Sequence, residues 1–395
     1  MKKLILAYSG GLDTSYCAKS LSEEGYEVHA VSVNTGGFTT DEIKKIEKKA
    51  MQLGVVSYVS IDAVQNFYDR VVKFLIYGNV LKNNTYPLSV SAERIVQAVE
   101  IVNYAKKVGA KYIAHGSTGA GNDQVRFDMI FQVLAPNIKI ITPIRDQKLS
   151  RQEEIEYLKG KGIDMPWEKA KYSINKGLWG TSVGGSETLT SHLPLPDDAY
   201  PSQLKINGTQ KIKLTFEKGE LIAIDDKKDK PVNNIEKLQE LASQFAIGRD
   251  IHVGDTIIGI KGRVGFEAAA PLIIIKAHHT LEKHVLTKWQ QQHKDYLSNW
   301  YGMLLHEGQY LDEVMRNIEV FLTDSQKNVS GDVYVSLNPY RFNIDGIKSK
   351  HDLMNASFGS YGEVNKGWTA NDAKGFIKIL SNSAKIHQAV NKTEI

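Results

Sequence analysis

A polar stretch near the start of the chain has the composition of a phosphate-binding loop. The apolar run Leu4–Tyr8 is followed by Ser9-Gly10-Gly11, and a helical pattern then runs from Asp13 to Glu24. Glycine lets other groups approach the backbone closely, and the first turn of a helix presents unpaired N–H groups at the positive end of its dipole. With the hydroxyl groups of Thr14 and Ser15 added, the stretch predicts a site for a phosphate or pyrophosphate.

The type of phosphate loop can be narrowed by what it lacks. The chain has no G-x-x-x-x-G-K-[ST] pattern, and no G-x-G-x-x-G follows Tyr8. These absences disfavour a P-loop nucleotidase and a dinucleotide-dependent dehydrogenase. A Ser-Gly-Gly loop without a lysine suits a pyrophosphate that leaves intact. The simpler alternative is an ordinary strand-to-helix turn, with Asp13 near the helix cap.

A second polar stretch, His115–Arg126, reads HGSTGAGNDQVR and contains three glycines. Arg126 can hold a carboxylate with two parallel hydrogen bonds, Asp123 can accept from an ammonium group, and Asn122 can both donate and accept. Both signs of charge beside a nucleotide loop predict an amino-acid substrate. The alternative is a solvated loop with an internal Asp123–Arg126 pair. His115 is as well suited to a structural hydrogen bond as to a ligand contact.

The elements that must position these stretches alternate over the first 165 residues. Apolar runs predict strands at Leu4–Tyr8, Val28–Val33, Val56–Ile61, Tyr112–His115 and Ile138–Pro143. Helical patterns lie between and after them at Asp41–Leu53, Ala63–Tyr77, Ser91–Val108 and Arg151–Lys161. This alternation predicts a parallel sheet with helices on both faces, which binds ligands at the carboxyl ends of its strands. Both polar stretches follow a strand and belong at that edge.

The second half has a mixed α+β pattern. Lys171–Pro201 is rich in Gly, Ser and Pro, which indicates a long functional loop or an interdomain connection. Elsewhere the pattern predicts a hairpin at Lys211–Phe216 and Leu221–Ile224, a helix at Ile235–Ala246, a long helical region from His278 to about Leu322, and a strand at Asp332–Leu337. Asn371–Val390 predicts an amphipathic helix, either for oligomer contacts or for docking on its own domain. We therefore expect domains at 1–165 and 166–370 and a helix in 371–395.

Bulk composition bounds the functional class. The 395 residues exceed a typical single core, which favours two domains. With 49 basic and 45 acidic residues the formal charge is +4, too weak to favour a nucleic-acid partner. The single cysteine, Cys17, suits a reducing cytoplasm and is expected to be a core residue. No apolar run is long enough for a signal peptide or a membrane span, so we expect a cytoplasmic protein with no membrane partner.

Two motifs in register carry a resemblance to a known family. SGGLDTS resembles the signature of the N-type ATP pyrophosphatases, which cleave ATP between the α and β phosphates. HGSTGAGNDQVRF is similar to a loop of the argininosuccinate synthase family, and the resemblance extends over most of the chain, including Ile257–Arg263 and Asp372–Ile379. It implies an adenine nucleotide α-hydrolase-like domain, followed by an α+β synthetase domain with a C-terminal multimerisation helix.

The resemblance also implies a reaction. The ureido oxygen of citrulline attacks the α-phosphorus of ATP, and Mg²⁺-bound pyrophosphate leaves. The amine of aspartate then displaces AMP from the citrulline adenylate, which gives argininosuccinate in arginine biosynthesis. Placement in line and stabilisation of charge on phosphate oxygens do most of this work. Members of the family form homotetramers.

The resemblance assigns residue roles by position. ATP would contact Ala7, Tyr8, Ser9, Gly10, Gly11, Leu12, Asp13, Thr14, Ser15, Val33 and Gly116. Citrulline would contact Tyr86, Ser91, Asn122, Arg126, Ser173 and Ser182, and aspartate would contact Thr118, Asn122 and Asp123. We interpret Asp13 as organising Mg²⁺ or the loop. Asp123 and an ATP phosphate are the candidates to accept the proton of the aspartate amine. No set of residues dedicated to a metal is predicted.

The chain departs from the family at one end of the expected citrulline site. The family usually has a glutamate and, twelve residues later, a tyrosine, where this chain has Gly254 and Phe266. Asp255 could replace the missing acid, or the pocket could take a citrulline whose amino group is acylated and uncharged. We expect free citrulline, with an N-acylated citrulline as the alternative.

Three other functions share part of these features. A tRNA-thiolating enzyme of the same superfamily usually needs a persulfide cysteine and a basic surface, which Cys17 and a charge of +4 do not supply. A glutaminase-linked amide synthetase would explain SGGLDTS but not HGSTGAGND. A nucleotide-binding regulator without turnover would need only the first 165 residues.

Overall fold

The computed structural model describes residues 2–163, 165, 171–355 and 367–392. These residues form two compact units, Met1–Lys350 and His351–Ile395. The predicted boundary near residue 165 stays a prediction, because residues 164 and 166–170 lie outside the described part.

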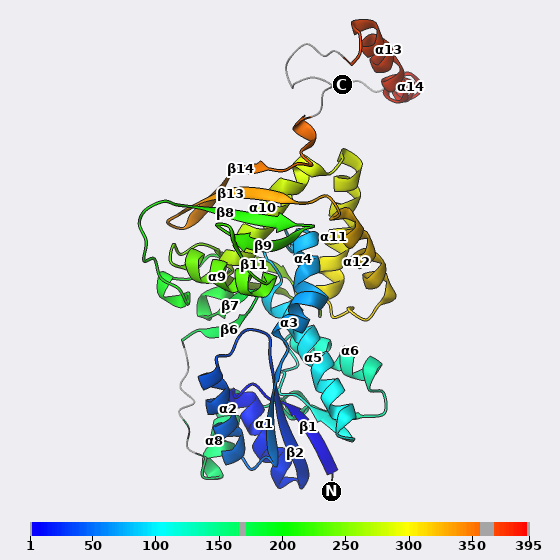
Figure 1. Ribbon diagram of the computed structural model, residues 1–395. Helices are drawn as coiled ribbons and strands as arrows, with labels where there is room; N and C mark the ends of the chain where they lie inside the picture. Colours follow the sequence, from blue (N-terminus) through cyan, green and yellow to red (C-terminus); the bar gives the residue numbers. More distant parts are fainter. Residues whose placement is uncertain (1, 164, 166–170, 356–366, 393–395) are drawn as a thin grey trace. The chain divides into compact units, whose positions relative to one another are not determined.

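The first part of the chain forms one parallel sheet, shown in the lower half of Figure 1. Its strands are β1 (Lys2–Ala7), β2 (Tyr26–Asn34), β3 (Ser57–Asp62), β4 (Tyr112–Ala114) and β5 (Lys139–Ile141). They lie in the order β3-β2-β1-β4-β5, and every neighbouring pair is parallel. The strands are the five that the apolar runs predict. Since β1 and β4 are neighbours, the loops that follow them meet at one edge.

Helices cover both faces of this sheet. On one face lie α1 (Leu12–Glu23), α2 (Thr40–Gln52) and α8 (Arg151–Gly160), and on the other lie α5 (Ser89–Lys107) and α6 (Asp123–Leu134). Side chains alternate along β1, so that Leu4 and Leu6 join the core under α1 while Ile5 joins the core under α5. A short helix, α7 (Pro143–Gln147), follows β5. The predicted α/β class is confirmed.

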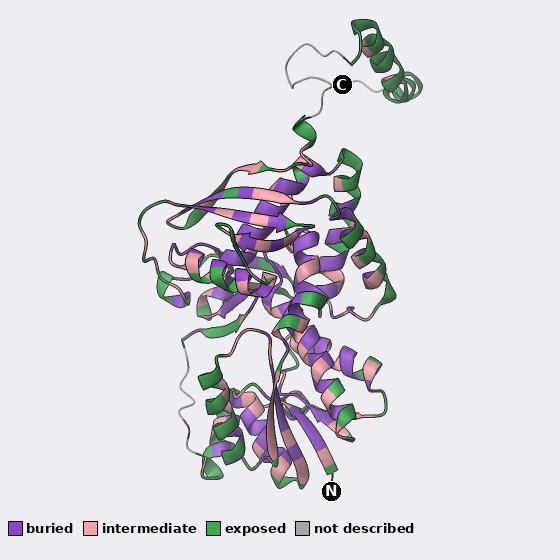
Figure 2. Ribbon diagram, viewed as in Figure 1, coloured by how far each residue is buried: buried purple, intermediate pink, exposed green. Residues whose placement is uncertain are grey.

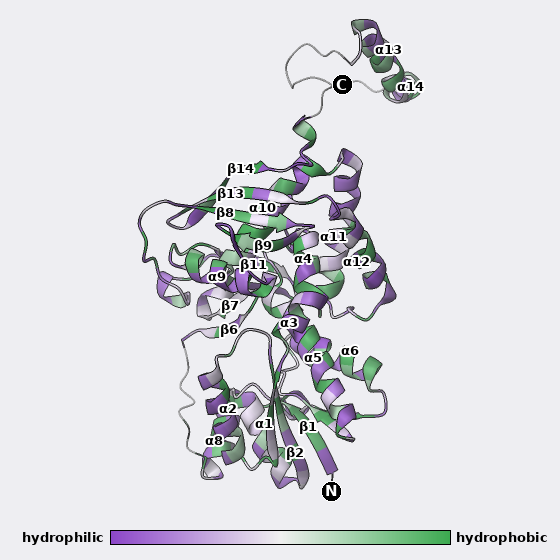
Figure 3. Ribbon diagram, in the orientation of Figure 1, coloured by the Kyte–Doolittle hydropathy of each residue, from purple (hydrophilic) through white to green (hydrophobic). Residues whose placement is uncertain are grey.

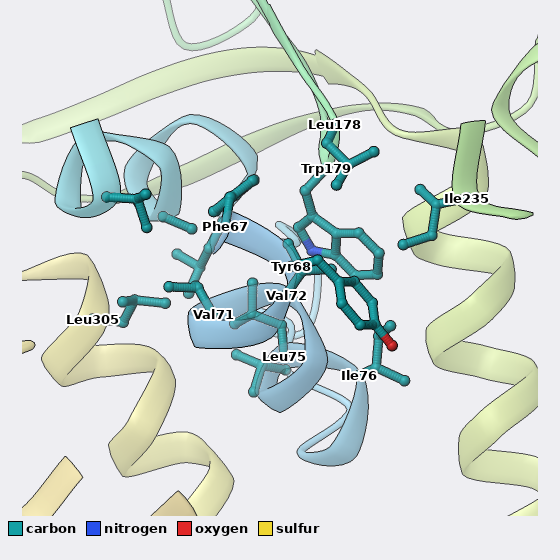
Figure 4. Close-up of a cluster of buried hydrophobic side chains, with 14 of the residues drawn as sticks. Phe67, Tyr68, Val71, Val72, Leu75, Ile76, Leu178, Trp179, Ile235 and Leu305 are labelled. Atoms are coloured by element: carbon teal, nitrogen blue, oxygen red, sulfur yellow. The ribbon is translucent and has the colours of Figure 1, made fainter. Parts of the chain in front are cut away.

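The predicted helix Ala63–Tyr77 is broken into three consecutive helical pieces. They are α3 (Val64–Phe67), the π-helical turn η1 (Tyr68–Val72) and α4 (Lys73–Tyr77). Figure 4 shows their side chains packed with Trp179, Ile235 and Leu305, which come from later parts of the chain. One continuous hydrophobic core therefore joins the parallel sheet to the second half. Figure 2 shows buried positions in both parts.

The second half contains a five-stranded antiparallel sheet with helices packed on it. The sheet has the order β10-β9-β8-β13-β14. Its strands are β8 (Gln210–Glu217), β9 (Glu220–Ile224), β10 (Lys227–Lys228), β13 (Gly331–Asn338) and β14 (Arg341–Lys348). The helices of this half are α9 (Pro231–Ser243), α10 (Ala269–Val285), α11 (Lys288–His306) and α12 (Glu313–Ser325).

The long helical region predicted from His278 to Leu322 is wrong as a single element. Thr287 caps α11 in a capping box with Gln290, which ends α10 just before it. After α11, Gly308 takes a φ of 80°, a left-handed conformation that stops a helix. These local signals divide the region into three helices.

A four-stranded sheet corrects the prediction of a loop at Lys171–Pro201. The sheet has the order β11-β12-β7-β6, from β6 (Ser173–Gly177), β7 (Gly180–Gly184), β11 (Arg249–Asp255) and β12 (Lys261–Glu267). Two 3₁₀ turns follow β7, at Ser186–Leu189 and Asp197–Ala199. The hairpin of β6 and β7 escaped prediction because Gly, Ser and Asn are poor strand formers, and pairing with β12 holds β7 in place.

The described residues of the unit from His351 onward form a 3₁₀ turn (Leu353–Asn355) and two helices, where a single helix was predicted. They are α13 (Ala370–Leu380) and α14 (Asn382–Asn391), and Thr369 caps α13 in a capping box with Asp372. Apolar positions recur along both helices (Figure 3). Their side chains are exposed, among them Phe376 and Ile377. Among the described residues, no helix has the length and apolar content of a membrane span.

Candidate active site

The main cavity lies at the edge of the parallel sheet where β1, β2 and β4 end. Its volume is about 1010 Å³, at the upper limit for a pocket that holds one small molecule. The wall comes from the loops after β1 and β4, the start of α5, the hairpin of β6 and β7, and the turn between β11 and β12. The cavity therefore has room for more than one ligand.

At one end of the cavity, the loop after β1 holds itself in place through short-range hydrogen bonds. The hydroxyl of Ser9 accepts from the backbone N–H of Gly11 at 3.3 Å and lies 3.2 Å from the hydroxyl of Thr14. Gly10 has a φ of 77°, in the region that favours glycine. This shape turns the chain directly into α1, whose first-turn N–H groups begin at the cavity wall.

A lysine from α2 supports the same loop. The ammonium group of Lys49 donates to the carbonyl oxygen of Gly10 at 2.7 Å, and burial lowers the pKa of Lys49 to about 8. A Cβ atom at Gly10 would lie 3.1 Å from Ile46 on that helix. Sequence reasoning missed Lys49 because nothing in the pattern of α2 separates it from the other lysines there.

The loop after β4 closes onto the first turn of α1. A Cβ atom at Gly116 would lie 3.1 Å from the carbonyl carbon of Asp13 and 3.2 Å from the backbone nitrogen of Thr14. A side chain at Gly116 would thus crowd the backbone that a phosphate would approach. The absence of a side chain, rather than flexibility, is what this position requires.

Asp13 does not cap α1, which overturns the alternative of a helix-cap role. The cap residue is Gly11, without a side-chain hydrogen bond, and Asp13 lies within the first turn and lines the cavity. Behind it, Glu154 of α8 is buried. Burial and the negative charge of Asp13 raise the pKa of Glu154 to about 8. At neutral pH, Glu154 is therefore mostly uncharged.

The other end of the cavity contains an ion cluster around Asp123. Its carboxylate accepts from Arg94 Nε at 2.9 Å and from Arg126 Nη1 at 3.0 Å. Burial raises the pKa of Asp123, but the two guanidinium groups outweigh burial and the net pKa lies below its ordinary value. The internal Asp123–Arg126 pair does form, and all three side chains line the cavity. Arg94 was missed, although it lies one helical turn after Ser91.

Arg126 and Asn122 connect this cluster to the second half of the chain. Arg126 is buried and donates to the carbonyl oxygen of His306 through Nε at 3.0 Å and Nη2 at 2.9 Å. The side-chain oxygen of Asn122 accepts from the backbone N–H of Ile257 at 2.9 Å. The loop after β4 is thus fixed against α11 and against the turn between β11 and β12.

His115 has a structural role in this loop. Its Nε2 lies 2.8 Å from Asp128, and its Nδ1 accepts from the backbone N–H of Ser117 at 3.1 Å. Arg145 donates to the other oxygen of Asp128 at 2.7 Å. The ring of His115 also reaches the cavity wall, but both of its nitrogen atoms already have partners.

Most of the predicted site residues line this one cavity. They are Ala7, Tyr8, Ser9, Gly11, Leu12, Asp13, Thr14, Val33, Tyr86, Ser91, Gly116, Thr118, Asn122, Asp123, Arg126, Ser173 and Ser182. Gly10 and Ser15 lie behind the wall, and the hydroxyl of Ser15 donates to the carbonyl oxygen of Gly11 at 2.7 Å. The structure thus brings the set together, while the role of each residue stays a prediction. Wall residues that sequence reasoning missed include Glu93, Arg94, His252, Arg263 and His306.

The two departures from the family pattern have different surroundings. Gly254 lines the cavity, whereas Phe266 is fully buried, with its ring centre 5.4 Å from that of Tyr86. Asp255 pairs with Lys261 at 2.7 Å, and this hydrogen bond lowers the pKa of Asp255. The carboxylate suggested as a replacement for the missing acid is therefore already engaged.

The fold and the cavity together define a class of protein. A parallel α/β domain with an open helix terminus, next to a pocket of mixed charge, suits a nucleotide-dependent ligase, because it can hold a nucleotide phosphate beside a charged substrate. Family models agree: "Arginosuccinate synthase N-terminal HUP domain" matches residues 3–164, and "Arginosuccinate synthase C-terminal domain" matches residues 172–387. The chain belongs to the argininosuccinate synthase family, and it is an ATP-dependent ligase.

Curated relatives match over nearly the whole chain. An argininosuccinate synthase of Methanocaldococcus jannaschii is 36% identical over 392 residues, which cover 98% of each chain. One of Xanthomonas campestris is 35% identical over 403 residues, covering 99% of each. One of Sulfolobus acidocaldarius is 36% identical over 382 residues, covering 96% of each.

Proposed function

We propose that the chain ligates citrulline to aspartate with ATP, forming argininosuccinate, AMP and pyrophosphate. Family membership over nearly the full length supports this proposal. The observation that carries it is that the open N-terminus of α1 and the mixed-charge cluster around Asp123 line the same cavity. A nucleotide phosphate and an amino-acid substrate can therefore meet there.

ATP binds at the end formed by the loop after β1. The backbone N–H groups of the first turn of α1 hold the phosphates, together with the hydroxyl groups of Ser9 and Thr14. Gly116 keeps this approach open, and the backbone at Val33 borders the adenine. The helix dipole and the N–H groups favour the negative charge that develops as pyrophosphate leaves.

Citrulline and aspartate bind at the other end. Arg126 and Ser91 face the citrulline, with Tyr86, Asn122, Ser173 and Ser182 around it. Asp123 and Thr118, again with Asn122, face the aspartate. The ureido oxygen of citrulline attacks the α-phosphorus in line, the bond to pyrophosphate breaks, and the adenylate forms.

The second step releases AMP. The amine of aspartate attacks the ureido carbon, the carbon–oxygen bond breaks, and AMP leaves with that oxygen. The amine must lose a proton, and the lowered pKa of Asp123 makes its carboxylate a weak acceptor. A phosphate oxygen of the departing nucleotide is therefore the better acceptor of the two candidates.

Mg²⁺ is expected to enter with ATP. Within the described residues, no group of three or more His, Cys, Asp and Glu side chains could hold a metal by itself. Mg²⁺ commonly takes one or two carboxylates together with substrate phosphates, and the cavity-facing Asp13 fits that pattern. When bound, the ion neutralises charge on the leaving pyrophosphate.

We further propose a cytoplasmic homotetramer without nucleic-acid or membrane partners. Exposed apolar side chains on α13 and α14, such as Phe376, Ile377, Ile386 and Val390, would be covered by other copies of the chain. Light scattering on the purified protein measures the assembly.

Pyrophosphate release tests the proposed reaction. Purified protein is incubated with ATP and Mg²⁺, alone, with citrulline, with aspartate, and with both, and pyrophosphate and argininosuccinate are measured. We expect argininosuccinate only with both amino acids and in equal amount to pyrophosphate. Tight ATP binding without pyrophosphate release under any condition would instead indicate a nucleotide-binding regulator.

A further inference from the structure

Two histidines at the far end of the cavity have no role in the reaction as described. His306 ends α11 and His252 lies in β11, and both line the cavity beside Tyr86 and Arg126. Their exposed fractions are 7% and 6%. Each ring has a buried nitrogen without a hydrogen-bond partner among the described residues, Nε2 in His306 and Nδ1 in His252.

The contacts of His306 fix which of its nitrogens carries the proton. Arg126 Nη2, which can only donate, lies 3.2 Å from Nδ1 of His306, and the hydroxyl of Ser91 lies 3.5 Å from the same atom. Nδ1 therefore accepts, and in the neutral ring the proton is on Nε2. Burial, followed by the charges of Arg126 and Lys82, lowers the pKa of His306 to about 3, although the Asp255 backbone acts in the opposite direction. His306 thus presents a buried N–H donor that makes no hydrogen bond of good geometry, although the Asp255 backbone lies close to the ring.

His252 is held by its ring face, and a glycine leaves the space beside it open. Its ring stacks on Tyr86, with centres 5.3 Å apart and planes at 24°. A Cβ atom at Gly254 would lie 2.7 Å from His252 Nε2, so any side chain there would displace the histidine. Burial and the charge of Lys82 lower the pKa of His252. This ring is therefore also neutral at neutral pH and able to donate.

The charges around the two rings favour an anion. Lys82 acts on both rings as a positive group, and Arg126 acts on His306. Among the carboxylates nearby, Asp255 pairs with Lys261, and Asp123 pairs with Arg94 and Arg126. Glu307 also acts on Lys82 as a negative group, and Glu93 lies in the wall near Asp123. A buried donor without a partner is costly, and a carboxylate oxygen would satisfy it while facing two cations.

We propose that His252 and His306, with the open space at Gly254, form a subsite for a carboxylate of the ureido substrate. The inference rests on the proposed function, because the ligand is that substrate. Two sources share this chemistry, namely the α-carboxylate of citrulline itself and a carboxylate at the end of an acyl group on its α-nitrogen. Both histidines act as specificity residues at the end of the cavity remote from the ATP phosphates.

Matched variants test the subsite in the full-length protein. His306→Asn keeps an acceptor near Nδ1 but removes the Nε2 donor, whereas His306→Gln keeps a donor near Nε2. His252→Phe keeps the ring that stacks on Tyr86 and removes its nitrogens. KM and kcat are measured for citrulline and for N-succinylcitrulline, with KM for ATP as the control, and circular dichroism reports folding.

His306→Asn and His252→Phe should raise KM about 10- to 100-fold for the substrate whose carboxylate binds this subsite. KM for ATP should stay unchanged, and His306→Gln should retain most of the binding. If KM already rises with citrulline, the subsite binds the α-carboxylate. If KM rises only with N-succinylcitrulline, the subsite binds the carboxylate of the acyl group. KM values within twofold of the parent for both substrates would overturn the proposal.

A binding experiment separates failure of the subsite from failure of the proposed function. Calorimetric titration compares citrulline and N-succinylcitrulline with their amides, in which the carboxylates are replaced. In the parent protein the carboxylates should bind at least about tenfold more tightly than the amides, and His306→Asn should abolish that difference. If the parent and His306→Asn prefer the carboxylates over the amides equally, the subsite is overturned. This result does not depend on whether the protein turns over either substrate.

Discussion

The two ends of the cavity are built in different ways. The nucleotide end is made largely of backbone from two loops. Its loop after β1 is held mainly by hydrogen bonds between residues at most five positions apart, such as Ser9 with Thr14, and the bond from Lys49 to Gly10 is an exception. The substrate end is made of side chains from α5, α6, β11 and α11, and Arg126 with His306 joins residues 180 positions apart. Figure 1 shows how the second half closes over the edge of the parallel sheet.

Because of this difference, the nucleotide end is a general phosphate-binding site, whereas the substrate end is specific for its ligand. Backbone N–H groups at a helix terminus recognise a phosphate whatever else the ligand carries. A set of side chains drawn from distant elements can change residue by residue while the fold stays the same. The substrate end is accordingly where this chain departs from its family, at Gly254 and Phe266.

The largest effect is expected at Arg126, which connects Asp123 and His306 at the substrate end of the cavity. Arg126→Met removes two hydrogen bonds to the carbonyl oxygen of His306, one to its Nδ1, and the ion pair to Asp123. We expect kcat/KM for citrulline to fall about 10³-fold and the apparent Tm to fall by several degrees, since breaking a buried pair costs about 3–5 kcal/mol. Steady-state kinetics and thermal unfolding measure both.

Lys261→Met is the matched control, because Lys261 forms an exposed pair at the same cavity rim. Exposed pairs contribute about 1 kcal/mol or less, so its activity should stay within about threefold of the parent. Equal losses in the two variants would show that Arg126 has no special part in the site.

The nucleotide end is tested by adding one methyl group. Gly116→Ala places a Cβ about 3.1 Å from the backbone of Asp13, where overpacking costs about 1–3 kcal/mol. We expect KM for ATP to rise about 10- to 100-fold, with KM for citrulline nearly unchanged. Gly119→Ala in the same loop is the control, since its Cβ would meet only Arg145 at an ordinary 3.5 Å. A larger effect from the control would contradict this account.

A smaller, pH-dependent effect is expected from Glu154. Its folded-state pKa, about 8, lies above the ordinary value of 4.5, so the folded protein holds a proton that the unfolded chain releases. The stability associated with this group is therefore present below about pH 4.5 and is lost as pH rises through 8. Above pH 8, a second negative charge also appears beside Asp13, and KM for ATP should rise.

Glu154→Gln removes this titration. The variant should match the parent in apparent Tm near pH 5 and exceed it by at least about 2 °C at pH 9, with KM for ATP constant between pH 7 and 9. Thermal unfolding and ATP kinetics at pH 5, 7 and 9 test both expectations. A parent protein whose KM for ATP does not change across that range would rule out coupling of Glu154 to the phosphate site.

The smallest effect on catalysis is expected from the exposed apolar side chains of the C-terminal unit. Ile377→Asp places a charge on the exposed apolar face of α13 and should dissociate the tetramer. Activity per subunit should stay within about twofold. Lys374→Asp on the same helix is the control for charge. Light scattering that gives the same mass for both variants and the parent would remove the proposed role of this face.

The contrast between the two ends also explains what could be predicted from the sequence. The five parallel strands and the phosphate loop are contiguous and follow local patterns, and the structure has the elements where those patterns lie. The breaks between α10, α11 and α12 depend on a cap at Thr287 and a left-handed Gly308, which a broad helical pattern conceals. The hairpin of β6 and β7 depends on pairing with β12, a contact distant in the chain.

Parts of the candidate site had no local signal at all. His252 and His306 lie in ordinary strand and helix patterns, and their shared place beside Tyr86 and Arg126 arises only from packing. Arg94 is different, because its position one turn after Ser91 on α5 could have indicated it. Asp13 lies in the first turn of α1 and not at its cap, since the glycine before α1 takes the cap position itself.

The central claim is that one cavity joins nucleotide and ureido substrate through an adenylate, and an oxygen label tests it most directly. Citrulline carrying ¹⁸O in its ureido group is converted with ATP and aspartate, and the products are analysed by mass spectrometry. The account predicts one ¹⁸O atom in the phosphate of AMP and none in pyrophosphate or argininosuccinate. AMP without the label would contradict attack by the ureido oxygen on the α-phosphorus.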